Sequence, residues 1–378
     1  HYHHLMRIAV DARLTHYSAG GIAEYIQQLS TRLPELDTLN DYLVLHAIKS
    51  RQEHHRNVRT KIVKCWTPAH HFLERYSLTV ELLPRNVHLL HSPDSIPPRG
   101  GPWKSVITIH DLSFLLYPHF LTPDSQKYYN NQIQDAVHRA DAILADSHST
   151  RNDILEHLGV PSEKVTTVYL APHERFKPQP SHLVKSIISR LKLPSQYLLF
   201  VGTFEPRKNI TGLLKAYASL LAKQHDAPPL IMIGRQGWLH EPIESLVYKL
   251  NLSGQVQIRT NIDTEDLPAI YTGALALLLP SHYEGFGFPV LESMACGTAA
   301  VISNRGSLPE IASDAAIQCD PDTSESIEEA ISLLLTDAKL REDLETQGIK
   351  RSAMFTWHKC CQDTLDVYKR VLQSTKIT

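Results

Sequence analysis

Apolar runs of strand length alternate with helix-length stretches along most of the chain, and this alternation constrains the fold more than any other feature. Residues 22–33 and 125–137 are two of the helical stretches. Strands separated by helices pair in parallel, so the alternation predicts doubly wound α/β sheets. The expected strands are residues 7–11, 42–48, 87–91, 106–110, 142–145 and 165–170, and then residues 197–201, 230–233, 256–259, 274–279, 299–302 and 316–318.

The alternation stops once, near residues 171–182, where three prolines occur, and then starts again. A chain of 378 residues also exceeds the size at which a single core stops growing. We therefore predict two domains. Residues 1–5 are interpreted as an expression remnant, 6–172 as an N-terminal Rossmann-like domain, 173–195 as a linker region and 196–356 as a C-terminal Rossmann-like domain.

Composition excludes several classes of protein. The formal net charge is −2, from 38 basic and 40 acidic residues, which gives no electrostatic reason to expect a nucleic acid partner. The five cysteines are odd in number and lack a Cys-x-x-Cys pair, which is typical of reduced thiols in a cytoplasmic protein. No apolar run approaches the ~20 residues of a membrane-spanning helix.

Two features suggest ion or surface binding without establishing it. The 22 histidines contain no His-Glu-x-x-His motif, and Asp320-Pro321-Asp322 is interpreted as helix capping, so no metal site is expected. The segment 49–64 is basic and is followed by Trp66. A solvated face is favoured for it, and a membrane-facing patch stays open as the alternative.

Residues 274–298 carry the strongest functional signal. A strand-length run leads into a turn with Glu284 and Gly285, and Pro289 then stands where a helix begins, with Glu292 in its first turn. Such a loop at the carboxyl end of a parallel strand faces the crevice where ligands bind. Carboxylates accept hydroxyl hydrogen bonds well, so we expect one of these glutamates to hold a ribose and the other a sugar.

A second candidate follows the expected strand 197–201. Gly202 permits a close turn, and Arg207 and Lys208 then place two positive charges at the strand end. A diphosphate leaving group requires such compensation where no metal supplies it.

In the first half, His110 follows a strand, and its imidazole is expected to face a ligand with Asp111 fixing its orientation. The pair Gly20 and Gly21 opens a helix. These glycines are consistent with a phosphate cradle and equally with an ordinary strand-to-helix turn.

Taken together, these motifs resemble the retaining glycosyltransferases of family 4, and the resemblance covers nearly the whole chain from Met6. It rests on Glu284-x7-Glu292, on the segment from Val201 to Ile210, on His110-Asp111 and on Gly20-Gly21. The resemblance implies the GT-B fold, with two Rossmann-like domains facing a central cleft. It also implies that a C-terminal helix over 357–375 packs back on the N-terminal domain, which would hold the acceptor.

By position, the resemblance assigns Glu284 to the donor sugar, Glu292 to the ribose and Lys208 to the diphosphate. His110 would reach the sugar from the first domain, and the segment 260–266, which includes Asn261, would border the base. One departure is Thr203, which stands where many members of the family have arginine. The expected catalytic residues are His110, Arg207, Lys208 and Glu284, and the expected donor-binding residues are Gly20, Gly21, Thr203, Arg207, Lys208, Asn261, Glu284, Gly285, Phe286, Gly287, Phe288 and Glu292.

The expected activity is metal-independent transfer of a hexose, with retention, from a nucleotide-diphosphate sugar to a carbohydrate or lipid-linked glycan. UDP-glucose is favoured as donor and GDP-mannose comes next. The setting is exopolysaccharide or cell-surface glycan synthesis, with no further cofactor, in the cytoplasm or at the inner face of the membrane. A GT-B epimerase or phosphorylase and a non-catalytic sugar-nucleotide-binding subunit remain alternatives. A nicotinamide dehydrogenase is disfavoured because neither half has Gly-x-Gly-x-x-Gly.

Overall fold

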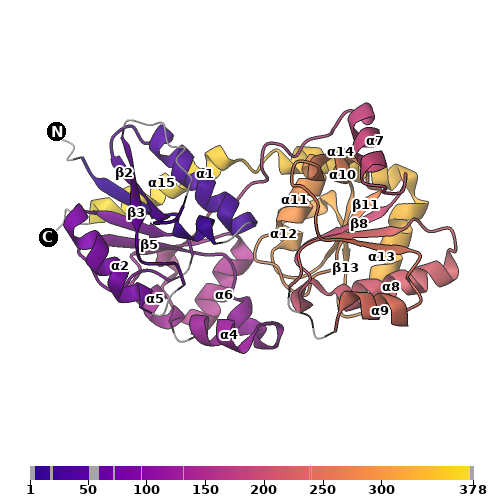
Figure 1. Cartoon of the computed structure of the whole chain (residues 1–378), viewed down its shortest axis with the longest axis horizontal. Helices are drawn as coiled ribbons and strands as arrows, with labels where there is room; N and C mark the ends of the chain where they lie inside the picture. Colours follow the sequence, from indigo (N-terminus) through magenta and orange to yellow (C-terminus); the bar gives the residue numbers. More distant parts are fainter. Residues whose placement is uncertain are drawn as a thin grey trace. The chain divides into compact units, whose positions relative to one another are not determined.

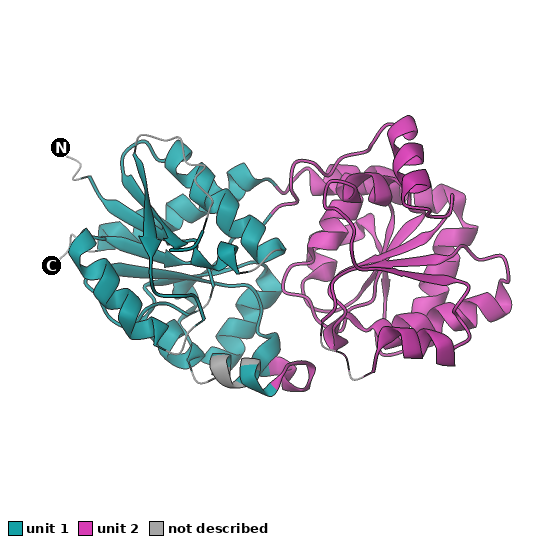
Figure 2. Ribbon diagram, viewed as in Figure 1, with its two compact units in different colours: residues 1–115, 123–170, 356–378 teal, residues 116–122, 171–355 magenta. Residues whose placement is uncertain are grey.

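The computed structural model describes residues 5–17, 20–50, 59–70, 73–94, 96–130, 132–237, 239 and 241–374. The chain forms two compact units, which Figure 2 colours separately. Unit 1 comprises residues 1–115, 123–170 and 356–378, and unit 2 comprises residues 116–122 and 171–355. Each unit is built on one twisted sheet with helices on both of its faces (Figure 1).

The sheet of unit 1 has seven strands in the order β3-β2-β1-β4-β5-β6-β7, all paired in parallel. The chain winds in one direction from β1 to β3 and in the other from β4 to β7. The crevice of such a sheet therefore opens at the carboxyl ends of β1 and β4, where the winding reverses. The strands are β1 (Arg7–Asp11), β2 (Asp41–Ala47), β3 (Thr60–Cys65), β4 (Leu89–Ser92), β5 (Lys104–Ile109), β6 (Ala142–Ala145) and β7 (Val165–Thr167).

The helices of unit 1 include α15 (Trp357–Gln373), the last helix of the chain, which packs against α1. Trp357, Cys361, Leu365 and Tyr368 recur at helical spacing and are buried, so this face holds α15 on unit 1. The other helices are α1 (Gly21–Leu36), α2 (Glu74–Leu82), α3 (Ser113–Leu116), α4 (Pro123–Asn130), α5 (Ile133–Arg139) and α6 (His148–Leu158), with 3-10 turns η1 (Arg13–His16), η2 (Leu83–Arg85) and η4 (Ser162–Lys164).

The sheet of unit 2 has six parallel strands in the order β10-β9-β8-β11-β12-β13, and its winding reverses between β8 and β11. The strands are β8 (Leu198–Val201), β9 (Leu230–Ile233), β10 (Val256–Arg259), β11 (Ala276–Leu279), β12 (Ala300–Ser303) and β13 (Ile317–Cys319). The helices are η3 (Pro118–Phe120), α7 (Ser181–Arg190), η5 (Pro206–Lys208), α8 (Ile210–Lys223), α9 (Ile243–Lys249), α10 (Leu267–Gly273), α11 (Phe288–Ala295), α12 (Leu308–Ala312), η6 (Ser313–Ala315), α13 (Ser324–Thr336) and α14 (Ala338–Ser352).

The expected α/β class and the two doubly wound parallel sheets are confirmed. Every expected strand is present, with ends that differ by three residues at most. Strand β3 was missed because its exposed lysines, Lys61 and Lys64, gave the sequence a basic rather than a strand-like character. It lies at the edge of the sheet, where lysines discourage pairing with another chain.

Three other segments differ from expectation. The single helix expected over 125–137 is two helices, α4 and α5. The region 173–195, expected to be a linker, belongs to unit 2 and contains α7, whose Ile187 is buried in the core of that unit. Of the basic segment 49–64, residues 51–58 lie outside the described part of the chain, as do residues 1–4 of the expected remnant.

Candidate functional site

The centre of the candidate site is Glu284, on the loop after β11. One carboxylate oxygen lies 2.6 Å from Lys208 Nζ and accepts a 2.7 Å hydrogen bond from Ser281, and the other lies 2.8 Å from the Arg207 guanidinium. Arg207 also pairs with Glu205 at 2.7 Å. These residues meet because the loops after β8 and β11 are neighbours at the point where the winding of the sheet reverses.

The ion pair of Glu284 and Lys208 is buried, with each residue about 5% exposed. Burial alone would raise the pKa of Glu284, but the charges of Lys208 and Arg207 lower it to about 2. Burial, together with repulsion from Arg207, lowers the pKa of Lys208 in spite of the attraction of Glu284. Glu284 is therefore a carboxylate at neutral pH, and it holds two cations together.

The backbone of the Glu284 loop is fixed by the segment after β12. Ser307 donates its backbone N–H and its hydroxyl to the Glu284 carbonyl, at 3.2 and 2.9 Å, and the hydroxyl also lies 2.9 Å from the Phe286 carbonyl. Gly306 has φ +60°, and a Cβ there would lie 2.9 Å from the Glu284 carbonyl oxygen. Neither Ser307 nor Gly306 was identified from the sequence, because the neighbour of this loop depends on the strand order.

The expectation that Glu292 lies in the first turn of its helix was wrong, because α11 begins at Phe288 and Glu292 falls in the second turn. Its carboxylate accepts a 2.7 Å hydrogen bond from the buried Tyr271 hydroxyl. Gly287 is the N-cap of this helix with φ +100°, a left-handed conformation that favours glycine. Phe286 is buried, and its ring contacts those of Phe288 and Phe355. These contacts fix the entrance of α11 beside Glu284.

The remaining residues expected to bind donor in unit 2 also follow strands. Thr203 follows β8, Asn261 follows β10 and is exposed, and Gly285 is buried next to Glu284. Because all strands of the sheet are parallel, these three residues lie at the same edge as Lys208. The structure thus gathers the expected unit 2 residues at one edge of the sheet, which leaves their roles toward a donor as predictions.

In unit 1, His110 follows β5 and both of its ring nitrogens are engaged. Nδ1 lies 2.6 Å from the buried carboxylate of Asp146, and Nε2 lies 2.7 Å from the Pro93 carbonyl. The expectation that Asp111 orients this histidine was wrong: Asp111 instead accepts hydrogen bonds from the N–H and hydroxyl of Ser113. The partner is Asp146 because β6 lies beside β5, which brings the two strand ends together.

We expect His110 to remain protonated well above neutral pH. Burial alone would lower its pKa, but the Asp146 carboxylate raises it from 6.5 to about 9. The stabilisation from this pair is therefore complete below about pH 6.5 and is lost as the pH rises through about 9. NMR titration of the imidazole should show this pKa in the wild type and a clearly lower one in Asp146→Asn, where the Asp146 charge no longer opposes the effect of burial.

A matched control for this titration is His157→Gln, which alters an exposed histidine of α6. It should leave the His110 titration unchanged. A wild-type His110 that titrates near 6.5 would contradict the coupling to Asp146.

Two further expectations concern short motifs. Gly20 caps α1, which begins at Gly21, with φ +117°, whereas Ser18 and Ala19 lie outside the described residues. The Asp-Pro-Asp segment does not cap a helix as expected, since Thr323 is the N-cap of α13. Its two carboxylates instead pair with Arg305, which lies between them. Within the described part of the chain, no three His, Cys, Asp or Glu side chains are grouped to hold a metal ion.

Two parallel-sheet Rossmann-like units of this kind define the GT-B class of glycosyltransferases. The chain is similar in structure to sucrose-phosphate synthase from Thermosynechococcus elongatus, with a TM-score of 0.77 at 20% identity over 98% of this chain and 100% of the other. A glycosyltransferase from Rickettsia africae gives a TM-score of 0.75 at 16% identity, with all of both chains covered. At these identities the likeness concerns the fold.

Sequence comparison establishes the family. The model of Glycosyltransferase Family 4 matches residues 19–171, and the model of Glycosyl transferases group 1 matches residues 185–351. The O-antigen chain mannosyltransferase B of Escherichia coli is 32% identical over 75% of this chain and 74% of its own length. The serotype-specific mannosyltransferase WbdA of the same species is also 32% identical over 75% of this chain, which spans 35% of that longer protein.

The chain belongs to family 4 of the glycosyltransferases, which confirms the resemblance seen in its motifs. It is therefore a glycosyltransferase.

Proposed function

We propose that this protein transfers mannose from a nucleotide-diphosphate mannose to a hydroxyl of a growing surface polysaccharide, with retention at the anomeric carbon. The observation that carries the proposal is the pair of cations, Arg207 and Lys208, held by Glu284 at the winding reversal of unit 2. The sugar and the setting come from the two Escherichia coli relatives, an O-antigen chain mannosyltransferase and a serotype-specific mannosyltransferase. UDP-glucose, preferred from the sequence, becomes the alternative donor.

The proposed chemistry places the diphosphate against Arg207 and Lys208. Both residues lie on η5, directly after β8, and their charges offset the negative charge that develops on the leaving group. The bond from the anomeric carbon to the phosphate oxygen breaks, and a bond to the acceptor oxygen forms on the same face. The acceptor proton passes to the departing phosphate oxygen, so the proposal requires neither an enzymic nucleophile nor a metal ion. His110 retains its predicted role toward the donor sugar.

Donor specificity tests the proposal. The protein is incubated with GDP-mannose or UDP-glucose and a mannose-terminated oligosaccharide, and the products are analysed by mass spectrometry. We expect the acceptor to gain one hexose from GDP-mannose, with UDP-glucose at least about 100-fold less efficient, as expected where polar groups built for one ligand are left unpaired by another. Transfer from UDP-glucose but not from GDP-mannose would show that the proposed donor is wrong. Transfer that is abolished by EDTA and restored by Mg²⁺ would contradict the metal-independent chemistry.

Unit 1 carries a surface suited to a membrane. Leu73, Tyr76, Val80 and Leu83 recur at helical spacing along α2 and its ends, and each is at least half exposed. These four residues, the α2 stripe, give the helix an apolar outer side, while its inner side buries residues such as Leu78. No helix of the described chain is long and apolar enough to cross a bilayer.

Basic and aromatic groups accompany the α2 stripe. The Arg99 guanidinium donates to the Tyr76 hydroxyl at 3.1 Å, and Lys61 is exposed on the edge strand β3, on the face that packs against α2. Trp66 donates its backbone N–H to Glu81 of α2 and is 59% exposed. An apolar stripe bordered by cations and an interfacial aromatic is typical of a surface that binds anionic lipid, and we include such binding in the proposed function.

Vesicle binding tests the α2 stripe. The substitution Val80→Asp should weaken co-sedimentation with vesicles containing phosphatidylglycerol by about tenfold or more, because burying a valine contributes about 1.5 kcal/mol. Tyr248→Asp, which alters an even more exposed hydrophobic side chain on α9 of unit 2, is the control and should bind like the wild type. Equal binding by Val80→Asp would contradict a membrane role for α2.

A further inference from the structure

A line of buried hydrogen bonds runs through unit 1 from its last helix to the surroundings of His110. The Tyr368 hydroxyl of α15 lies 2.5 Å from His91 Nδ1, and His91 Nε2 lies 2.8 Å from Thr108 Oγ1. Thr108 Oγ1 lies in turn 2.9 Å from the Tyr25 hydroxyl of α1. These four side chains, the hydrogen-bond chain, join α15, β4, β5 and α1.

The hydrogen-bond chain is dry and uncharged. Each of its four side chains is at most 1% exposed, so a group that loses its partner there has no bulk water to replace it. Burial, together with the positive charge of His110, lowers the pKa of His91 to about 3. A neutral imidazole donates at one nitrogen and accepts at the other, so His91 satisfies Tyr368 and Thr108 without bringing a charge into the core.

Tyr25 is the member of the hydrogen-bond chain that meets His110. The two rings pack edge to face, with centroids 5.3 Å apart and planes at 84°. The other contacts of the imidazole lie at its two nitrogens, which pair with Asp146 and with the Pro93 carbonyl. Hydrogen bonds at the two nitrogens leave rotation about the line that joins them open. The Tyr25 ring limits that rotation.

Helix α15 supports Tyr25 at two points. The Trp357 ring, at the first residue of the helix, lies 6.4 Å from the Tyr25 ring and is tilted by 31° to it. Tyr368 reaches the Tyr25 hydroxyl through the hydrogen-bond chain. Trp357 and Tyr368 are about three helical turns apart and both are buried, so they share the inner face of α15. The same helix therefore holds both the ring and the hydroxyl of Tyr25.

We propose that the hydrogen-bond chain holds the Tyr25 ring against His110 and so makes α15 a positioning element for sugar transfer. Its four members are positioning residues, because they are buried and act through the imidazole. The importance of His110 for transfer rests on the proposed function. A displacement of about 1 Å in a reacting group can cost about 100-fold in rate, so a side chain as distant as Tyr368 can affect turnover.

NMR titration of His110 in the full chain tests the proposal without any turnover. The titratable groups that act on this imidazole are Asp146, Asp94 and the neutral His91, and all three stay in place in Thr108→Val. This substitution removes the hydroxyl that joins His91 to Tyr25. An imidazole that moves away from Asp146 loses the charge that raises its pKa, so the pKa of His110 should fall from about 9 toward 6.5. Thr108→Ser keeps the hydroxyl and should retain the wild-type titration.

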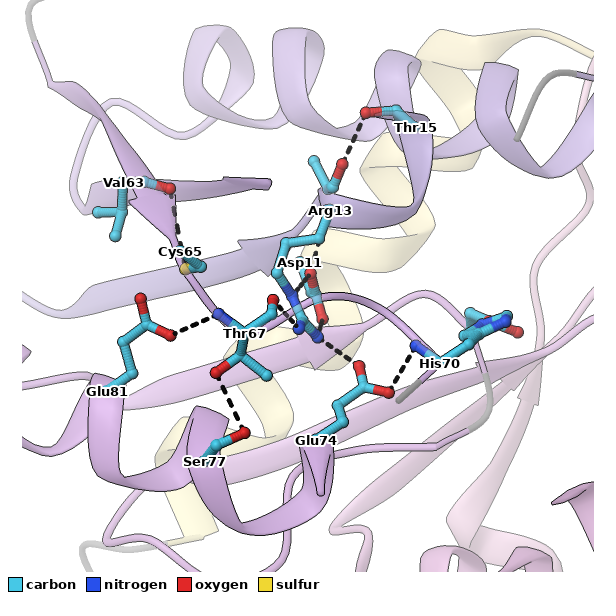
Figure 3. Close-up of polar contacts among 12 residues, drawn as sticks. Asp11, Arg13, Thr15, Val63, Cys65, Thr67, His70, Glu74, Ser77 and Glu81 are labelled. Carbon is cyan, nitrogen blue, oxygen red and sulfur yellow. Dashed lines mark hydrogen bonds and ion pairs between the residues drawn. The ribbon is translucent and has the colours of Figure 1, made fainter. Parts of the chain in front are cut away.

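Tyr368→Phe tests the far end of the hydrogen-bond chain. It removes one oxygen atom from α15 and keeps the ring, so it decides the question even if Thr108→Val does not fold. The pKa of His110 should again fall. The matched control is Thr67→Val, which alters an equally buried threonine whose hydroxyl lies 3.1 Å from that of Ser77, among the contacts around Arg13 (Figure 3). It should titrate like the wild type.

A wild-type titration of His110 in both Thr108→Val and Tyr368→Phe would overturn the proposal, whether or not the protein transfers sugar. An equal fall of the pKa in Thr67→Val would overturn it too, because the change would then report a general loss of stability.

Activity separates this proposal from the proposed function. With GDP-mannose, Thr108→Val should lower kcat about tenfold and leave KM for the donor within about twofold, because the diphosphate is proposed to bind unit 2. If transfer occurs and kcat is unchanged although the titration has moved, the positioning role fails and the proposed function stands. If no nucleotide sugar is used while the titration moves, the proposed function fails and the support of His110 by α15 remains.

Discussion

Replacing Lys208 by alanine should lower kcat for sugar transfer by about 100- to 1,000-fold, the usual effect of removing one group that stabilises charge in a transition state. Lys208 Nζ lies at the carboxyl end of the sheet, where the diphosphate is proposed to bind, and its positive charge is fixed by Glu284 before any ligand arrives. A fixed charge needs no reorganisation during the reaction. Single-turnover kinetics with GDP-mannose measures the chemical step separately from product release.

The control for Lys208→Ala is Lys215→Ala, which removes an exposed lysine of α8 in the same unit. It should retain wild-type turnover. Because Lys208→Ala leaves Glu284 with Arg207 as a remaining cation, circular dichroism and thermal melting should show a folded protein. Near-normal turnover by a folded Lys208→Ala would remove this residue from the active site.

Replacing Glu284 by glutamine should both destabilise unit 2 and abolish most activity. The substitution leaves Lys208 buried beside Arg207 without a compensating charge, and breaking a buried ion pair from one side costs about 3–5 kcal/mol. The substitution is therefore expected to lower stability as well as turnover. Denaturant unfolding, with hydrogen exchange of β11 peptides to localise the change, measures the loss.

A double-mutant cycle with Lys208→Met separates pairing from other effects of the Glu284 substitution. The double variant has no buried lysine left without a counter-charge, so its free energy of unfolding should be higher than that of Glu284→Gln alone. The coupling free energy between Glu284 and Lys208 should be unchanged between pH 6 and 8. With a pKa of about 2, Glu284 contributes fully above its ordinary value of 4.5, and its contribution is lost only as the pH falls through about 2. If the losses in the free energy of unfolding of the two single variants add up to that of the double variant, the two side chains do not stabilise each other.

The alternation of apolar runs with helical stretches was sufficient to predict the parallel sheets, because buried parallel strands are continuous apolar runs such as that of β11. The same rule failed for β3, an edge strand whose lysines interrupt the apolar pattern. Glu284 and Lys208 each follow a strand, and the structure brings their side chains together, while their roles stay predictions. The sequence assigned them separate ligands, however, and could not show their mutual ion pair.

What the sequence could not supply is the order of strands within a sheet. His110 was paired with its neighbour Asp111, whereas the adjacency of β5 and β6 brings Asp146 to it. Contacts between residues that follow different strands are the hardest to predict from a single sequence, because they depend on the order of the strands in the sheet.

The most direct test of the account is the product formed from GDP-mannose labelled with carbon-13 at the anomeric carbon. After incubation with the protein and a mannose-terminated oligosaccharide, the one-bond carbon–proton coupling of the labelled atom reports the configuration of the new linkage. The account predicts a labelled glycosidic bond with the configuration of the donor, lost in Lys208→Ala and kept in Lys215→Ala. An inverted linkage, or a label that stays on the nucleotide, would contradict it.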